Sequence, residues 1–178
     1  MQKIKSMKKY LTLFLIPLFA WACKGPAGPQ GPPGEPGLIG QAFEVKANFT
    51  PDDYSQIFGF PQEITVLDTD VVMAYLLWEV NEETGNDVWQ PLPVSVFFDD
   101  GELQYAFDHT QADIQLFLTG NTDLSTVGSE WTQDQIFRVV ILPVDYIQSN
   151  NISLKDAKAV MKLVDKPNIK RYGIKRLQ

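Results

Sequence analysis

Residues 94–107, VSVFFDDGELQYAF, carry the clearest local fold signal in this chain. Two runs rich in β-branched and aromatic residues flank Asp100-Gly101, a dipeptide typical of two-residue hairpin turns. Glycine tolerates the positive φ that a type I′ turn requires. We therefore predict a β-hairpin with Asp100 and Gly101 at its turn.

Similar patterns on both sides of this hairpin predict further strands. In FEVKANF (43–49) apolar residues alternate with Glu44, Lys46 and Asn48, as in a half-buried strand. VVMAYLLWEV (71–80) is an apolar run short enough for a central strand, and DIQLFL (113–118) and QIFRVVIL (135–142) predict two more. Six to eight antiparallel strands separated by turns indicate a mainly β domain over residues 43–178, a β-sandwich or a jelly-roll-like module.

One short helix is expected near the C-terminus. Ser153 and Asp156 form an S-x-x-D start, and apolar residues then recur at helical spacing from Leu154 to Val164 before Pro167 ends the element. The remaining NIKRYGIKRLQ (168–178) is predicted to add a final strand at a sheet edge, where lysine and arginine discourage unwanted pairing.

Residues 1–22 have the features of a targeting segment. Four lysines precede Tyr10, and Tyr10–Ala22 is an uncharged, mostly apolar run of 13 residues. Because a transmembrane helix needs roughly 20 apolar residues, this segment predicts a cleaved signal peptide.

Cys23, the only cysteine in the chain, follows this segment directly. An unpaired cysteine is unusual in an exported protein. Three explanations are open: a lipid attachment site, a chance cysteine beside an ordinary signal-peptidase site, and an intermolecular disulfide.

The position of Cys23 resembles the lipobox of bacterial lipoproteins, in which the thiol is acylated and the cysteine becomes the mature N-terminus. Ala22 is the small residue before the cysteine, whereas Ala20 and Trp21 stand where the family usually has leucine and a small residue. The resemblance implies membrane anchoring by acyl chains such as palmitate, and two or more chains hold a protein stably. Because Lys24 is not the aspartate that signals inner-membrane retention in some of these proteins, the outer membrane is the expected location, and either leaflet is open.

Six Gly-X-Y triplets follow between Gly25 and Ala42. Glycine at every third position, with prolines between, is typical of the collagen triple helix, whose crowded axis accommodates only glycine. With Cys23, this run resembles the collagen-like lipoproteins of bacteria, which implies a stalk over residues 23–42 that carries a globular domain. A single polyproline-like chain would extend about 3.1 Å per residue, roughly 50 to 60 Å in all. Assembly of a homotrimer through the triplets is the alternative.

No motif predicts catalysis. The chain lacks G-x-S-x-G, H-E-x-x-H, P-loop and G-x-G-x-x-G patterns. His109, the only histidine, is expected to be solvated near a turn beside Asp108. Three acidic pairs match no calcium-loop spacing: Asp52/Asp53, Asp68/Asp70 and Asp99/Asp100. We therefore predict a protein that is not an enzyme and has no metal and no cofactor.

Charge is distributed unevenly along the chain. The formal net charge of -7 argues against a nucleic-acid partner. Residues 43–150 hold 19 acidic residues but only Lys46 and Arg138 as bases, whereas residues 151–178 hold eight basic and two acidic residues. We favour a basic C-terminal layer that packs across an acidic body. The other interpretation is contact with anionic lipid headgroups through Lys166, Lys170, Arg171, Lys175 and Arg176.

Aromatic residues suggest the remaining binding site. Trp131, in the polar stretch GSEWTQDQ (128–135), is the tryptophan most expected to be exposed and to contact a protein or glycan ligand. The sequence thus predicts an anchored envelope lipoprotein whose β domain serves interaction or structure. The alternative is an envelope protein that binds a polysaccharide, or hydrolyses one with two carboxylates.

Overall fold

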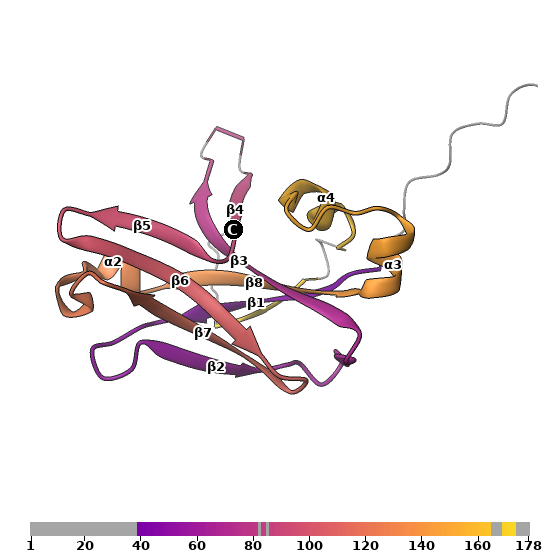
Figure 1. Ribbon diagram of the computed structural model, residues 1–178, viewed down its shortest axis with the longest axis horizontal. Coiled ribbons are helices and arrows are strands. Elements are labelled where there is room, and N and C mark those ends of the chain that lie inside the picture. Colours follow the sequence, from indigo (N-terminus) through magenta and orange to yellow (C-terminus); the bar gives the residue numbers. More distant parts are fainter. Residues whose placement is uncertain (1–38, 82, 85, 165–168, 174–178) are drawn as a thin grey trace, which may run out of the picture. The chain divides into compact units, whose positions relative to one another are not determined.

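The computed structural model describes residues 39–81, 83–84, 86–164 and 169–173. Residues 1–38, which include the predicted signal peptide, Cys23 and most of the Gly-X-Y run, lie outside this range. The described part is a two-layer β-sandwich (Figure 1), so the prediction of a mainly β, largely antiparallel sandwich is confirmed.

The first layer is a five-stranded sheet with the order β4-β3-β8-β1-β9. Its strands are β1 (Gln41–Ala47), β3 (Asp70–Val80), β4 (Asp87–Pro91), β8 (Gln135–Pro143) and β9 (Lys170–Tyr172). All neighbours are antiparallel except β9, which pairs in parallel with β1. The predicted C-terminal edge strand is therefore present at Lys170–Tyr172.

The second layer is a four-stranded antiparallel sheet with the order β2-β7-β6-β5. Its strands are β2 (Ser55–Gly59), β5 (Val94–Phe98), β6 (Gly101–His109) and β7 (Asp113–Gly120). Between the two layers, alternate side chains of both sheets form the main core, in which Phe43, Leu103 and Phe137 are at most 1% exposed.

The β5–β6 hairpin forms where the sequence predicts it, but its turn differs. Phe98 pairs with Gly101, so the turn residues are Asp99 and Asp100, and neither has a positive φ. The prediction of a type I′ turn at Asp100-Gly101 is therefore wrong. Glycine is required at position 101 for space, because a Cβ atom there would lie 2.8 Å from the backbone nitrogen of Thr122.

Short helices cover the outer face of the five-stranded sheet. The helices α3 (Val144–Ser149) and α4 (Ala157–Lys162) bury Ile147 and Val160 against β-strand residues that include Tyr75. The third helix, α2 (Ser129–Thr132), and the 3-10 turn η2 (Leu124–Thr126) lie before β8. Only one helix is predicted from the sequence, so α2 and α3 are additions.

The predicted helix is α4, and it begins later than expected. Asp156 is its N-cap, and the carboxylate accepts hydrogen bonds from the backbone N–H groups of Lys158 and Ala159. The Asp156 side chain caps the unpaired backbone N–H groups at the start of the helix. Ser153 therefore lies before the helix and does not cap it.

The last Gly-X-Y triplet belongs to the sandwich. Gln41 and Ala42 are the first residues of β1, two residues before the predicted domain boundary. The amides of Ile39 and Gly40 both donate to the Leu163 carbonyl oxygen, at 3.0 and 2.9 Å. A Cβ atom on Gly40 would lie 2.8 Å from the Leu142 Cδ2 atom, so close packing explains this glycine without a triple helix.

Candidate ligand-binding surfaces

The outer face of the five-stranded sheet holds a buried cluster of charges. Glu44, in β1, is 0% exposed, and its Oε1 atom accepts hydrogen bonds from Arg138 Nε at 3.1 Å and Nη2 at 2.5 Å. Its Oε2 atom accepts from Arg171 Nε at 2.9 Å. The guanidinium carbon of Arg138 lies 3.9 Å from the centroid of the Trp89 ring. This cluster is saturated by its own partners, so it is a structural feature.

Glu44 corrects the interpretation of residues 43–49 as a strand with one solvated face. The alternation is real, because Phe43 and Val45 face the main core. The opposite face is covered as well, because cross-strand pairing places Arg138 and Arg171 on either side of Glu44. The charged residue Glu44 is therefore part of a buried ion pair, and only its partners from distant parts of the chain show this.

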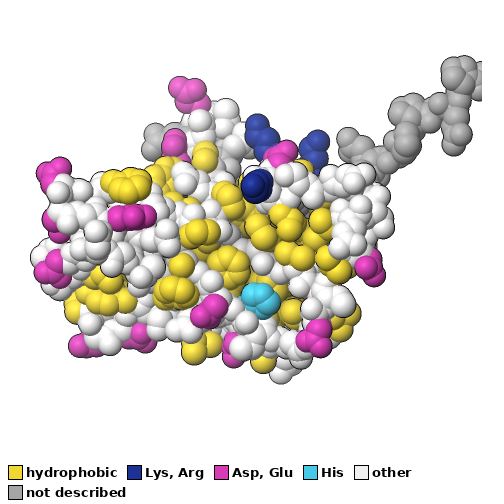
Figure 2. Space-filling view, viewed as in Figure 1, with side chains coloured by type: hydrophobic (Ala, Val, Ile, Leu, Met, Phe, Trp, Pro, Cys, Tyr) yellow, Lys and Arg dark blue, Asp and Glu magenta, His cyan; other side chains and the backbone are white. Residues whose placement is uncertain are grey.

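Two of the C-terminal basic residues that the structure describes are paired with acids of the body. Lys170 contacts the Glu63 carboxylate, and Arg171 contacts Glu44. The hydrogen bond and charge of each partner lower the pKa of Glu63 and raise the pKa of Lys170. In Figure 2, acidic side chains are spread around the visible face, whereas lysine and arginine side chains appear only towards the top. These pairs support the interpretation of a basic layer on an acidic body; Lys166, Lys175 and Arg176 lie outside the described residues.

Trp131 lies in α2 and is half-buried rather than exposed in a loop. Its ring packs edge-on against Phe98, with ring centroids 5.8 Å apart, and lies 6.1 Å from the ring of Trp78. Its carbonyl oxygen accepts a hydrogen bond of 2.6 Å from the Tyr105 hydroxyl. Trp131 is therefore partly a core residue, which the polar sequence around it does not indicate.

A small hollow of about 220 Å³ lies beside this aromatic group. Trp78 is 39% exposed and sits on the part of β3 that extends beyond its pairing with β8. The hollow is smaller than the roughly 300 to 1,000 Å³ of typical small-molecule sites. It is lined by Leu76, Leu77, Trp78, Tyr105, Glu130, Trp131 and Gln135.

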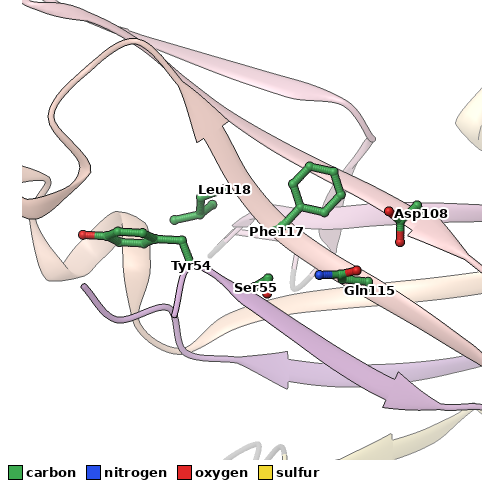
Figure 3. A pocket seen from close by; sticks show the side chains of 6 residues that line it. All are labelled: Tyr54, Ser55, Asp108, Gln115, Phe117 and Leu118. Atoms are coloured by element: carbon green, nitrogen blue, oxygen red, sulfur yellow. The ribbon is translucent and has the colours of Figure 1, made fainter. Parts of the chain in front are cut away.

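A larger hollow of about 430 Å³ lies on the outer face of the four-stranded sheet (Figure 3). It lies beside the cross-strand pair Ser55–Phe117, and Ala106 pairs with Phe117 on the other side. Sequence patterns alone do not reveal this site, because its residues come from three strands and meet only through the strand register. The hollow is lined by Tyr54, Ser55, Asp108, Gln115, Phe117 and Leu118.

Two polar side chains at this hollow have no competing partner. The next cross-strand row is Ile57–Gln115–Asp108, and neither the Gln115 amide nor the Asp108 carboxylate makes a hydrogen bond within the described part of the chain. In Figure 3, Gln115 and Phe117 project from β7 near Asp108, while the ring of Tyr54 points away from them. The arrangement offers an aromatic ring, an amide and a carboxylate to one ligand.

Catalytic or metal-binding groups do not gather elsewhere in the described ranges. His109 is exposed and its Nδ1 atom lies 3.2 Å from the Thr110 carbonyl oxygen. The residues described contain no group of three or more His, Cys, Asp or Glu placed to hold a metal ion. The acidic pairs instead contribute caps and turns: Asp53 accepts from Ser55, Asp70 from the Leu67 amide and Asp100 from Thr122.

Comparisons with protein-family models, curated proteins and solved structures found no match to this chain. No helix among the described residues is long and apolar enough to cross a membrane. The function of this protein is therefore inferred from its own residues.

Proposed function

We propose that this protein is a lipid-anchored envelope protein that holds a non-enzymatic β-sandwich domain at a bacterial membrane surface, with Cys23 as the lipidated residue. The observation that carries the proposal is the position of this single cysteine, directly after the apolar run Tyr10–Ala22 and two residues before the first Gly-X-Y triplet. Acyl chains on Cys23 would anchor the chain at about 0.8 kcal/mol per buried methylene group.

The junction at residue 40 supports direct mounting of the domain on the stalk. Strand β1 begins within the last triplet, and the amides of Ile39 and Gly40 are fixed to Leu163. In the sequence, the last Gly-X-Y triplet therefore overlaps the first strand of the sandwich. Seventeen residues from Cys23 to Ile39 at about 3.1 Å each would place the domain roughly 50 Å from the lipid.

A role in binding rather than catalysis fits the electrostatics of the domain. Groups with a clearly shifted pKa have structural causes: Glu63 is paired with Lys170, and Asp123 accepts hydrogen bonds from Ser125. Burial in the fold raises the pKa of Tyr75 to about 12. Burial also raises the pKa of Tyr105, which lines the smaller hollow and donates a hydrogen bond to the Trp131 carbonyl oxygen. None of these groups lines the larger hollow.

The test is the Cys23→Ser variant, expressed in a Gram-negative host and followed by membrane fractionation and by the mass of the N-terminal peptide. We expect the native protein in the outer-membrane fraction with an acylated N-terminus, and the variant in the soluble fraction. Lys24→Asp is the matched control: it keeps the cysteine, so the protein should stay lipidated and move towards the inner membrane. Unchanged membrane retention of Cys23→Ser would reject the proposal.

The soluble Cys23→Ser protein also tests assembly. Light scattering that gives three times the chain mass would support a homotrimer formed through the Gly-X-Y triplets. A monomeric mass would make the triplets a spacer.

A further inference from the structure

The two sheets present different outer faces. The five-stranded sheet is covered by α3 and α4, which form a second core with it. The outer face of the four-stranded sheet carries exposed apolar side chains instead, with Ile57 66% and Phe97 77% exposed. Between these two residues lies the hollow beside Phe117.

The charges of this sheet limit the class of ligand. Strands β2, β5, β6 and β7 contain no lysine and no arginine, whereas they contain Glu102, Asp108 and Asp113. A polyanion would therefore meet only repulsion on this surface. The ligand must be neutral or cationic.

The side chains at the hollow match a polyhydroxylated ligand. The face of the Phe117 ring carries the negative part of its quadrupole, which attracts the slightly positive C–H groups of a sugar ring. The Gln115 amide both donates and accepts hydrogen bonds, and the Asp108 carboxylate accepts them, which suits hydroxyl groups. A lysine or arginine side chain has no acceptor atom, so it would leave the N–H donors of the Gln115 amide unused, whereas sugar hydroxyl groups can both donate and accept.

We propose that this face binds a neutral saccharide chain, with one sugar ring against Phe117 and its hydroxyl groups bonded to Gln115 and Asp108. The hollow is open, so an extended chain across β2, β7 and β6 fits better than an enclosed small molecule. This inference concerns the sandwich alone and does not depend on acylation of Cys23.

The experiment is calorimetric titration of the full-length protein in a detergent without a sugar headgroup. The probes are three neutral hexasaccharides: cellohexaose, maltohexaose and the fully N-acetylated chitohexaose. We expect saturable binding of at least one of them. Phe117→Ala and Gln115→Ala should each weaken that binding about tenfold or more, the effect of one lost contact of about 1.4 kcal/mol. No binding of any of the three at millimolar concentrations would overturn the proposal.

Matched variants separate this site from its alternatives. Trp78→Ala removes the exposed tryptophan of the smaller hollow, so it should change the affinity less than twofold. If Trp78→Ala abolished saccharide binding and Gln115→Ala kept the native affinity, the ligand would bind at the smaller hollow. That result would overturn the proposal. Gln115 lies on the outer face of the four-stranded sheet, so Gln115→Ala is expected to fold. It therefore still tests the site if Phe117→Ala fails to fold.

A cationic peptide is the remaining competitor, and hexalysine is its probe. Asp108→Asn removes the charge but keeps an acceptor oxygen, so saccharide binding should fall only a few-fold and should be insensitive to salt. Tight, salt-sensitive binding of hexalysine that Asp108→Asn abolishes, without saccharide binding, would overturn the proposal.

Discussion

The two outer faces of the sandwich differ in whether their side chains are covered by other elements. The face of the five-stranded sheet buries Glu44, Arg138 and Tyr75 beneath helices and an added parallel strand. The face of the four-stranded sheet leaves Phe117, Gln115 and Asp108 uncovered beside a hollow. On the covered face, the charges of Glu44 and Arg138 are satisfied by each other; on the open face, the polar groups of Gln115 and Asp108 remain available. The difference suggests that substitutions on the first face change stability and those on the second change binding.

The largest expected effect tests the covered face. Glu44→Ala leaves the buried Arg138, which is 5% exposed, without its main partner. Removing one member of a buried ion pair typically costs about 3 to 5 kcal/mol of the free energy of unfolding. Denaturant titration measures this loss.

The control on the open face is Gln115→Ala, which should change stability by less than about 0.5 kcal/mol. Joint replacement of Glu44 and Arg138 by leucine should recover part of the loss, because it removes both buried charges, while Arg171 and Asp87 each lose one ionic contact. Equal costs for Glu44→Ala and Gln115→Ala would remove the contrast between the two faces.

The second effect concerns the junction with the Gly-X-Y run. In Gly40→Ala, the new methyl group must displace Leu142 or the Leu163 carbonyl, which lie 2.8 and 3.2 Å from it. Overpacking of this kind costs about 1 to 3 kcal/mol. Gly59→Ala is the matched control, because the closest atom to its methyl group, beyond the neighbouring residues, is the Ala112 carbonyl oxygen at 4.0 Å. Thermal unfolding of both variants checks this; equal melting temperatures would mean that Gly40 is not fixed by packing.

Two buried tyrosines provide a smaller effect of opposite sign. Tyr105→Phe removes the 2.6 Å hydrogen bond to the Trp131 carbonyl and should cost about 1 kcal/mol. The Tyr75 hydroxyl, on the covered face, has no hydrogen-bond partner among the described residues, so Tyr75→Phe should be neutral or stabilising. Chemical denaturation of the two variants measures both changes. A large loss in Tyr75→Phe would show that its hydroxyl is satisfied in solution.

The smallest effect is a change in the pH dependence of stability. Pairing with Lys170 lowers the pKa of Glu63 in the folded state, so its contribution is present above the unfolded pKa and is lost as the pH falls through the folded one. Because Glu63 and Lys170 are both exposed, solvent and salt weaken this pair. In Glu63→Gln, stability should therefore decline slightly less between pH 5 and pH 3 than in the native protein (roughly the acidic range over which carboxylates titrate). An unchanged pH profile would show that the pair contributes nothing.

Local patterns were enough to predict most of the described strands, but not the short strands β2 (Ser55–Gly59) and β4 (Asp87–Pro91). The alternation in residues 43–49 and the apolar runs at 71–80, 113–118 and 135–142 correspond to β1, β3, β7 and β8. These predictions succeed because alternation and short apolar runs are properties of the segment itself, and the run at 135–142 is buried on both faces of its sheet. The hairpin at residues 94–107 was found for the same reason, although its turn lies one residue earlier.

Features that depend on distant partners could not be predicted in this way. The burial of Glu44 requires Arg138 and Arg171, which are 94 and 127 residues away in the chain. The hollow beside Phe117 combines residues of β2, β6 and β7, which only the strand register brings together. The polar sequence around Trp131 hides its contact with Phe98, and the glycine period hides the entry of Gln41 into β1.

The junction at residue 40 also determines how the domain would respond to tension. A pull delivered through Gly40 acts along β1, which is bonded to β8 on one side and to β9 on the other. Its ladder hydrogen bonds run across the strand, so the load would stretch many of them together in shear instead of opening them one at a time. A sandwich entered through an interior strand of its sheet would therefore resist unfolding under the load that the proposed anchor would transmit.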